Sequence, residues 1–197
     1  LLPPEEPESG ALLADVFRRE GIDVRVDVKV VAASHDSNGF TLRLESGETL
    51  TAAQLLVAAG RRLQLAAAGL DVIGVDITAR AVPVDGRMRV APGVWAVGDM
   101  TGKGAFTHVS MYQAEIVVAD ILGTPGVPAA DYRGLPRVTF TDPEIGSVGL
   151  TESKARDRGL DVRTSSYPVP RSTRGWIHEA GNDGFIKLDP DAAQGIL

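Results

Sequence analysis

Apolar residues recur at helical spacing in two stretches of the chain. The first covers residues 11–20, where Ser9 is placed to cap the start of a helix and Gly21 to end it. The second covers residues 108–122, is rich in alanine and valine, and is followed by Gly123. We therefore predict an amphipathic helix near the N-terminus and a longer helix in the middle of the chain.

Alternation of apolar and polar residues predicts strands between these two helices. It is clearest in residues 22–30 and 40–44, and a short return strand begins at residues 49–51. Residues 37–39 and 45–48 contain serine, glycine and other polar residues, which is typical of turns. We expect an antiparallel meander with one buried face.

Two further segments are apolar without alternation. Residues 55–59 end at Gly60, and residues 93–99 end on the pair Gly-Asp. A strand that is apolar on both faces is typical of the middle of a layered α/β structure. Residues 63–85 show no period, so we expect a turn of helix and irregular connections there.

The last third of the chain follows another pattern. Residues 124–134 contain two prolines and two glycines without periodicity, and we predict a domain linker there. Four short strand patterns and one amphipathic helix follow, at residues 137–141, 145–149, 162–167, 184–188 and 151–158 respectively. This mixture predicts an α+β unit with an antiparallel sheet.

Composition and charge narrow the possible functions. The 197 residues include 20 Lys and Arg against 26 Asp and Glu, and the formal net charge of −6 argues against binding to nucleic acid or to anionic membranes. The absence of cysteine excludes disulfides, thiolate metal sites and cysteine nucleophiles within the chain, and the three histidines are too widely spaced for a short metal motif. No bilayer-spanning run or secretory signal is present, so we expect a cytoplasmic protein without a metal site.

Gly98 and Asp99 form the most informative candidate site. They follow a predicted buried strand, and open α/β folds bind ligands at the carboxyl ends of their strands. Gly98 lets a ligand approach the backbone, and the Asp99 carboxylate can accept hydrogen bonds from sugar or ribityl hydroxyls. The N–H groups near Thr107 and His108, where the next helix begins, can stabilise negative charge. An aspartate after a strand is also common as a turn or cap residue.

Four segments in this order resemble the flavin- and pyridine-nucleotide-dependent disulfide oxidoreductases, a family that includes dihydrolipoamide dehydrogenase, glutathione reductase and mercuric reductase. Leu55–Arg62 is similar to a strand signature of the family, and Gly93–Asp99 is similar to its second flavin motif. Phe106–His108 looks like the segment that reaches the isoalloxazine, and Pro136–Glu152 is similar to the opening of the interface domain. The resemblance covers nearly the whole chain.

The resemblance implies a fold, a domain order and an activity. The fold would be α/β, with a partial Rossmann-like domain for FAD and NAD(P), followed by an α+β interface domain that forms a homodimer. Residues 1–62 would be the second half of the NAD(P)-binding domain, residues 63–125 the C-terminal part of the FAD-binding domain, and residues 126–197 the incomplete interface domain. The parent protein would pass hydride from NAD(P)H to FAD, and then to a disulfide or other small-molecule acceptor.

The same resemblance implies roles for individual residues. Asp99, beside Gly98, would hold the ribityl hydroxyls of FAD. The backbone N–H of Thr107 would face the pyrimidine edge of the flavin, and His108 would begin the helix whose positive end favours negative charge there. Gly60 would lie where the NAD(P)-binding and FAD-binding domains meet. No residue of the chain is predicted to be catalytic.

Several parts of the family pattern are missing from the chain. Both Gly-x-Gly-x-x-Gly phosphate loops and any redox cysteine pair would precede Leu1, and the acid–base His and Glu would follow Leu197. Leu63 and Gln64 stand where the family often has Pro-Asn. We therefore expect a fragment that binds FAD weakly or not at all and that cannot complete the reaction alone.

Two other functions remain open. One is that of an FAD-dependent NAD(P)H oxidase or quinone reductase of related fold that uses no cysteine pair. The other is that of a non-catalytic module that dimerises through residues 126–197. A Cys-x4-Cys pair before Leu1 would identify a disulfide reductase, and a large homodimer interface would support the module, alone or beside the enzyme role.

The other chemistry-bearing residues have plainer interpretations. We expect His108 to begin a helix rather than act as a general base, and His178 to lie in an exposed loop over residues 176–182. Glu152 is interpreted as part of a first helical turn. Lys187, with two arginines upstream, could bind a phosphate, although scattered cations are usually solvated.

Overall fold

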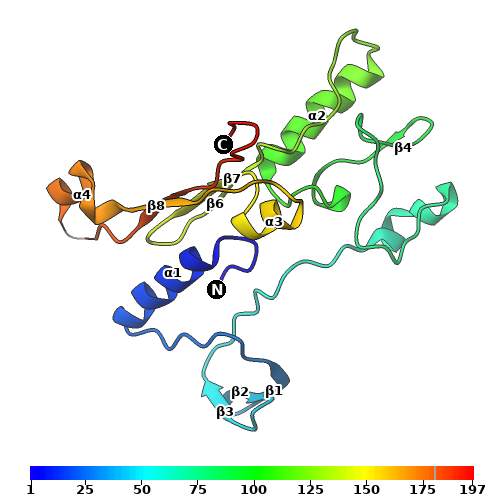
Figure 1. Ribbon diagram of the computed structural model, residues 1–197. Coiled ribbons are helices and arrows are strands. Elements are labelled where there is room, and N and C mark those ends of the chain that lie inside the picture. Colours follow the sequence, from blue (N-terminus) through cyan, green and yellow to red (C-terminus); the bar gives the residue numbers. More distant parts are fainter. Residues whose placement is uncertain (180) are drawn as a thin grey trace. The chain divides into compact units, whose positions relative to one another are not determined.

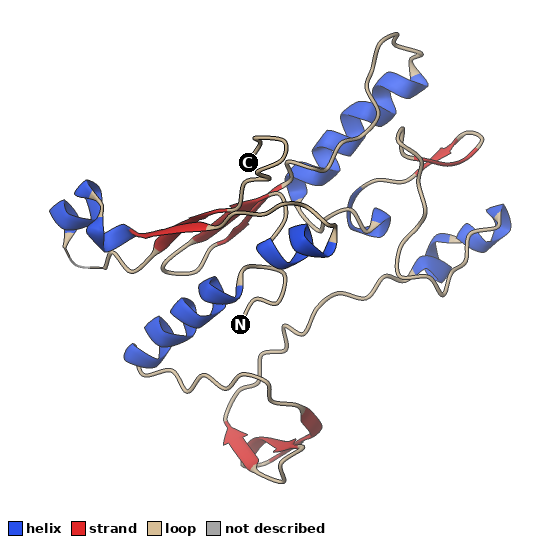
Figure 2. Ribbon diagram, viewed as in Figure 1, coloured by secondary structure: helices blue, strands red, loops and turns tan. Residues whose placement is uncertain are grey.

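The computed structural model describes residues 1–179 and 181–197. They form two compact units, one of residues 1–59 and 138–197 and the other of residues 60–137. Both units contain helices and strands (Figure 1, Figure 2). Each unit buries apolar residues of its own.

Helix α1 (Pro7–Arg19) begins the first unit. Pro7 stands in the first turn, where its missing N–H breaks no helical hydrogen bond, and Glu6 precedes it without a side-chain capping bond. Ser9 lies inside the helix, so the predicted cap is wrong. The predicted end is confirmed, because Gly21 follows just after the last helical turn.

Strands β1 (Val30–Asp36), β2 (Gly39–Leu44) and β3 (Thr49–Ala52) form the predicted antiparallel meander. A two-residue turn joins β1 to β2. The Asn38 N–H donates a hydrogen bond of 2.7 Å to Asp36 Oδ1 in this turn. The polar side chain thus stabilises the reversal that the sequence predicts.

Two segments predicted as strands are not strands. Residues 22–29 lie outside any sheet and are mostly exposed, and Asp27 interrupts them with a φ of 54°. Residues 55–59 also form no strand, and Leu56 is 91% exposed. Alternation of apolar and polar residues supported the first prediction, and a continuous apolar run supported the second. A strand also needs a neighbour with which to exchange backbone hydrogen bonds. In the described part of the chain, no strand pairs with either segment.

The C-terminal block confirms the predicted mixture of helix and strands. β6 (Pro136–Thr139) pairs with β7 (Ile145–Val148), and β8 (Ser165–Pro168) pairs antiparallel with β9 (Phe185–Leu188). Helix α3 (Glu152–Asp157) lies between the two pairs in sequence. Its start is fixed by the preceding threonine, whose hydroxyl accepts a hydrogen bond from a backbone N–H of the first turn.

One helix of this block is absent from the predictions. The 3₁₀ turn η4 (Val169–Arg171) leads into α4 (Thr173–His178), which begins with a Ser172 cap. The expected loop over residues 176–182 is therefore partly helical, and Ala180 lies outside the described residues. A serine cap and a single turn leave little periodicity to detect.

The second unit contains the candidate site. β4 (Arg89–Ala91) and β5 (Val94–Trp95) form a short antiparallel hairpin, which leads through the 3₁₀ turn η3 (Gly98–Thr101) to helix α2 (Thr107–Ile121). The strand predicted over residues 93–99 is thus much shorter than expected. The long helix is confirmed.

A small apolar core supports this unit. Leu65, Val82 and Ala96 are its buried members. Leu65 comes from η1 (Leu65–Ala68), which is followed by η2 (Leu70–Ile73), and these short helices confirm the expected irregular connection. Among the helices of the described residues, none is both long and apolar enough to cross a membrane.

Candidate functional site

Gly98 stands where the β4–β5 hairpin leads toward α2. Its φ of 77° lies in the left-handed region that favours glycine. It also packs against the helix, because a Cβ atom on Gly98 would lie 3.0 Å from Ser110 Oγ. The Gly98 N–H donates a buried hydrogen bond of 2.6 Å to Gln113 Oε1. Helix α2 therefore fixes the backbone directly before Asp99.

Asp99 places its carboxylate at the surface of η3. The side chain is 36% exposed and forms an ion pair with Arg61, whose side chain is 69% exposed. Arg61 follows Gly60 at the end of another segment that the sequence singles out, so the structure brings two of the four motifs together. An ion pair this exposed contributes little to stability and leaves the carboxylate able to accept other hydrogen bonds.

The start of α2 can receive a negative group from outside the chain. Among the described residues, no side chain caps this end: Phe106, the N-cap residue, makes no such bond, and the first turn contains no acidic residue. The N–H groups of Thr107 and His108 begin that turn. Because the first N–H groups of a helix have no partner within it, the positive end of α2 favours an acceptor.

The ring of His108 is bound to the backbone. Its Nε2 lies 3.0 Å from the carbonyl oxygen of Pro136, and the ring stacks on Phe106 with centroids 5.4 Å apart. Since a carbonyl only accepts, Nε2 carries the hydrogen. These contacts support the interpretation of His108 as a helix-start residue.

Sequence reasoning missed Gln113 and Asp120, two α2 residues that fix this region. Asp120, with a side chain only 2% exposed, accepts hydrogen bonds from Arg89 at 2.5 and 2.6 Å and from Trp95 Nε1 at 2.9 Å. Arg89, and then Trp95, hold the pKa of Asp120 below its ordinary value. The only signal in the sequence is that the two polar residues stand two helical turns apart, on one face of a mostly apolar helix.

Lys187 is bound to carboxylates rather than placed for a phosphate. Its side chain is 6% exposed, and Nζ lies 2.9 Å from carboxylate oxygens of Glu6, Glu8 and Glu152. Burial opposes the charge, but the hydrogen bonds that Lys187 donates raise its pKa above the ordinary value. Three acceptors match the three N–H donors of the ammonium group, so this cluster joins α1, α3 and β9.

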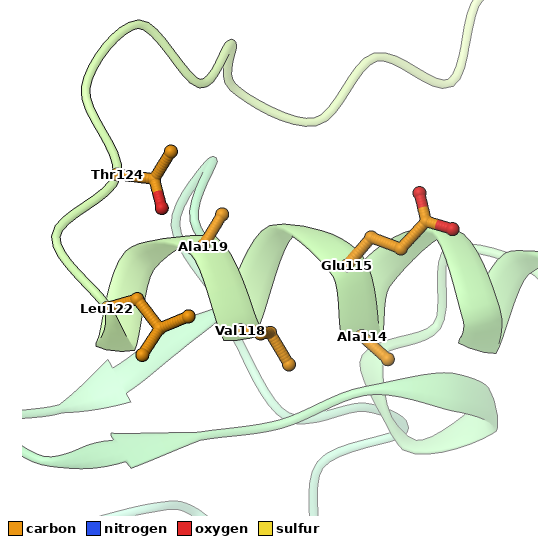
Figure 3. A pocket seen from close by; sticks show the side chains of 6 residues that line it. All are labelled: Ala114, Glu115, Val118, Ala119, Leu122 and Thr124. Carbon is orange, nitrogen blue, oxygen red and sulfur yellow. The ribbon is translucent and has the colours of Figure 1, made fainter.

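An open, apolar groove runs along α2 (Figure 3). It is lined by Ala114, Glu115, Val118, Ala119, Leu122 and Thr124. These residues follow the first turn of α2, so the groove does not coincide with the predicted site at Asp99. In the part of the chain that the structure describes, no group of three or more His, Asp or Glu side chains is arranged to hold a metal ion.

The sequence matches one known family along most of its length. Residues 1–114 match the family described as pyridine nucleotide-disulphide oxidoreductase, and residues 135–197 match the dimerisation domain of that name. These matches confirm the predicted fold class, a partial Rossmann-like nucleotide-binding domain followed by an interface domain.

The curated relatives include dihydrolipoyl dehydrogenases. The chain is 33% identical to the enzyme of Mycobacterium leprae over 100% of this chain and 43% of that protein. It is 34% identical to the enzyme of Pseudomonas aeruginosa over 95% of this chain and 40% of that protein. The chain therefore spans about two fifths of the length of these relatives.

Two solved structures are also similar to nearly the whole of this chain. LpdA from Mycobacterium tuberculosis matches with a TM-score of 0.83 at 25% identity, over 98% of this chain and 42% of that chain. The HOCl-induced flavoprotein disulfide reductase RclA from Escherichia coli matches with a TM-score of 0.81 at 29% identity, over 98% of this chain and 44% of that chain.

Proposed function

Because the chain belongs to the pyridine nucleotide-disulphide oxidoreductase family, we propose that it is part of a flavoprotein that passes hydride from NAD(P)H to FAD and then reduces a disulfide or similar acceptor. When bound, FAD supplies the redox chemistry. This chain would bind part of the cofactor and contribute to the dimer. The arrangement of Asp99 and the start of α2 around Gly98 supports this proposal most directly.

The residues around Gly98 fit a flavin. Asp99 presents an exposed carboxylate that can accept hydrogen bonds from the ribityl hydroxyls, and Arg61 would release that carboxylate on binding. The N–H groups of Thr107 and His108 can donate to the pyrimidine edge of the ring. The positive end of α2 would stabilise the negative charge that develops on the reduced flavin. Gly60, next to Arg61, would lie at the boundary with the NAD(P)-binding domain.

Replacement of Asp99 tests the proposed FAD site. We expect Asp99→Ala in the full-length protein to weaken FAD binding by about ten- to a hundredfold, because hydrogen bonds to a charged carboxylate are lost. The dissociation constant is measured by flavin fluorescence, and the bound fraction by visible absorbance. Asp71→Ala, an exposed acid in η2, is the control. Unchanged FAD binding in Asp99→Ala would contradict the site.

We propose that the acceptor is a disulfide. The relatives named as dihydrolipoyl dehydrogenases and as a disulfide reductase support this choice. The full-length protein should oxidise NADH or NADPH with lipoamide or oxidised glutathione faster than with a benzoquinone. The reverse order would favour the quinone reductase, in which no cysteine pair takes part.

We also propose that the protein forms a homodimer through residues 126–197. These residues are the predicted interface domain, which follows the predicted NAD(P)-binding part at residues 1–62 and FAD-binding part at residues 63–125. Large apolar side chains are exposed in the C-terminal segment, among them Phe140 at 84% and Trp176 at 73%, as expected of an interface. Phe140→Glu should shift the full-length protein from dimer to monomer in analytical ultracentrifugation. Ser46→Glu, in an exposed turn of the meander, should leave the dimer intact.

A further inference from the structure

Gln113 is completely buried in the middle of α2, with 0% of its surface exposed. Its side-chain amide is fully used. Oε1 accepts the hydrogen bond from the Gly98 N–H at 2.6 Å, and Nε2 donates to Thr101 Oγ1 at 3.0 Å and to the Tyr132 hydroxyl at 2.9 Å. A buried polar side chain with every group paired has a defined orientation, because any rotation leaves an unpaired group in an apolar surrounding.

The partners of Gln113 fix both polar groups of Gly98. Gln113 holds the N–H directly, and the Thr101 hydroxyl, itself an acceptor for Gln113, donates a bond of 2.8 Å to the Gly98 carbonyl. That carbonyl belongs to the peptide unit that leads into Asp99. The direction in which the Asp99 side chain leaves the backbone is therefore set from inside the unit.

The same side chain fixes this turn to the helix. Ser110 and Gln113 are one helical turn apart on α2 and both face Gly98, one by close packing and one by a hydrogen bond. The start of α2 lies on the same rigid helix. The spacing between the Asp99 turn and the N–H groups of Thr107 and His108 thus depends on the contact that Gln113 makes.

We infer that Gln113 is a positioning residue for the flavin, which holds the Asp99 turn and the start of α2 in the geometry that binds the ribityl chain and the ring together. This inference rests on the proposed function. Gln113 acts through the Gly98 backbone and does not itself touch the cofactor.

The acceptor atom is the part of Gln113 that matters. Methionine has nearly the same volume but no acceptor for the Gly98 N–H, and a buried N–H without a partner is costly. Glutamic acid in its protonated form keeps the acceptor for the Gly98 N–H, and its own hydroxyl can donate to Thr101 Oγ1, so the bond from Thr101 to the Gly98 carbonyl is kept. Comparison of the two variants therefore distinguishes the effect of the hydrogen bond to the Gly98 N–H from the effect of side-chain packing.

The test uses full-length protein and FAD fluorescence titration of Gln113→Met and Gln113→Glu. We expect FAD binding about tenfold weaker in the methionine variant, and within threefold of the parent in the glutamate variant. Tyr132→Phe, which removes another partner of Gln113 but leaves the Gly98 bond, should also remain within threefold. Weakening of less than threefold in Gln113→Met, or equal weakening in Gln113→Glu, overturns the inference.

Hydrogen–deuterium exchange gives a readout that needs no cofactor. In the apo-protein, peptides that contain Gly98 should exchange faster in Gln113→Met than in the parent and in Gln113→Glu, and unchanged exchange overturns the inference.

Should Gln113→Met not fold, Thr101→Val takes its place. We then expect at least a threefold loss of FAD affinity, and a smaller loss overturns the inference. If Asp99→Ala leaves FAD binding unchanged, the proposed site fails; if Asp99→Ala loses FAD and Gln113→Met does not, only the role of Gln113 fails.

Discussion

Within each of the two compact units, a buried charged side chain holds several elements together, and the two charges have opposite signs. In the first unit Lys187 contacts three glutamates from α1 and α3 and the residue before α1. In the second unit Asp120 contacts Arg87, which precedes β4, and Arg89 and Trp95 of the β4–β5 hairpin. The first centre has an excess of acid and the second an excess of base. Although each centre is a buried ion with several partners, the opposite charges make the two units respond differently to substitution and to acid.

The chain carries a reporter in each unit. Trp176 lies in the first and Trp95 in the second. When one tryptophan is replaced with phenylalanine, the fluorescence change during urea unfolding reports on the unit that contains the remaining tryptophan. Both centres can be compared in this way within one protein.

Loss of the buried lysine should have the largest effect. Lys187→Met leaves three carboxylates facing one another without their cation, and we expect the first unit to lose about 3 kcal/mol of unfolding free energy. The measurement is urea unfolding followed by Trp176. Lys29→Met, which breaks an exposed pair with Glu45, should change stability by about 0.5 kcal/mol or less. Equal effects of the two variants would contradict the comparison.

Loss of the buried aspartate charge should have a smaller effect, confined to the second unit. Asp120→Asn keeps an oxygen that can accept from Trp95 but removes the charge between Arg87 and Arg89. We expect a lower melting temperature for the signal of Trp95, and no change for that of Trp176. Asp131→Asn, in an exposed pair with Arg133, is the control. A change in the first unit alone would refute the assignment.

Acid should weaken the first unit through Glu152. Hydrogen bonds from Lys187, and then from Arg156, lower the pKa of Glu152 from 4.5 to about 2. A carboxyl group with a lowered pKa stabilises the fold above its unfolded pKa, and this contribution is lost as the pH falls through the folded pKa. The stability of the first unit should therefore fall between pH 4.5 and about pH 2, and less steeply in Lys187→Met. Parallel curves for the parent and the variant would contradict this cause.

The smallest expected effect has the opposite sign. Burial raises the pKa of Asp189, and within the described residues its Oδ1 has no hydrogen-bond partner. A raised carboxyl pKa means that ionisation at neutral pH destabilises the fold. Asp189→Asn should stabilise the first unit by about 0.5 kcal/mol at neutral pH, measured by urea unfolding, and the gain should shrink as the pH is lowered. Destabilisation at neutral pH would count against it.

Local patterns predict the elements that carry their own signals. The helices predicted at residues 11–20 and 108–122, the meander and the turn at Asn38 depend on spacing and turn chemistry. The structure has helices at Pro7–Arg19 and Thr107–Ile121 and has the meander as predicted, although the first helix begins earlier than predicted and is not capped by Ser9. The strands expected at residues 22–30 and 55–59 depended on neighbours that no local pattern specifies. Only Val30 of the first belongs to a strand.

The candidate site divides in the same way. The sequence singles out Gly98 and Asp99 because they end an apolar run, and Thr107 and His108 because they begin a predicted helix, and all four remain predictions as site residues. Gln113 and Asp120 were missed, and the pairing of Arg61 with Asp99 was not predicted, because these contacts depend on partners far along the chain. A sequence shows which groups can pair, but tertiary packing decides which of them do.

The bond from the His108 ring to the Pro136 carbonyl closes a loop of the backbone, because the two residues are 28 positions apart. The chain therefore returns, after helix α2 and the segment that follows it, to the first turn of α2. The imidazole of His108 thus connects the first turn of α2 to the first residue of β6. A displacement of Pro136 would therefore be transmitted to the start of α2 through the His108 ring.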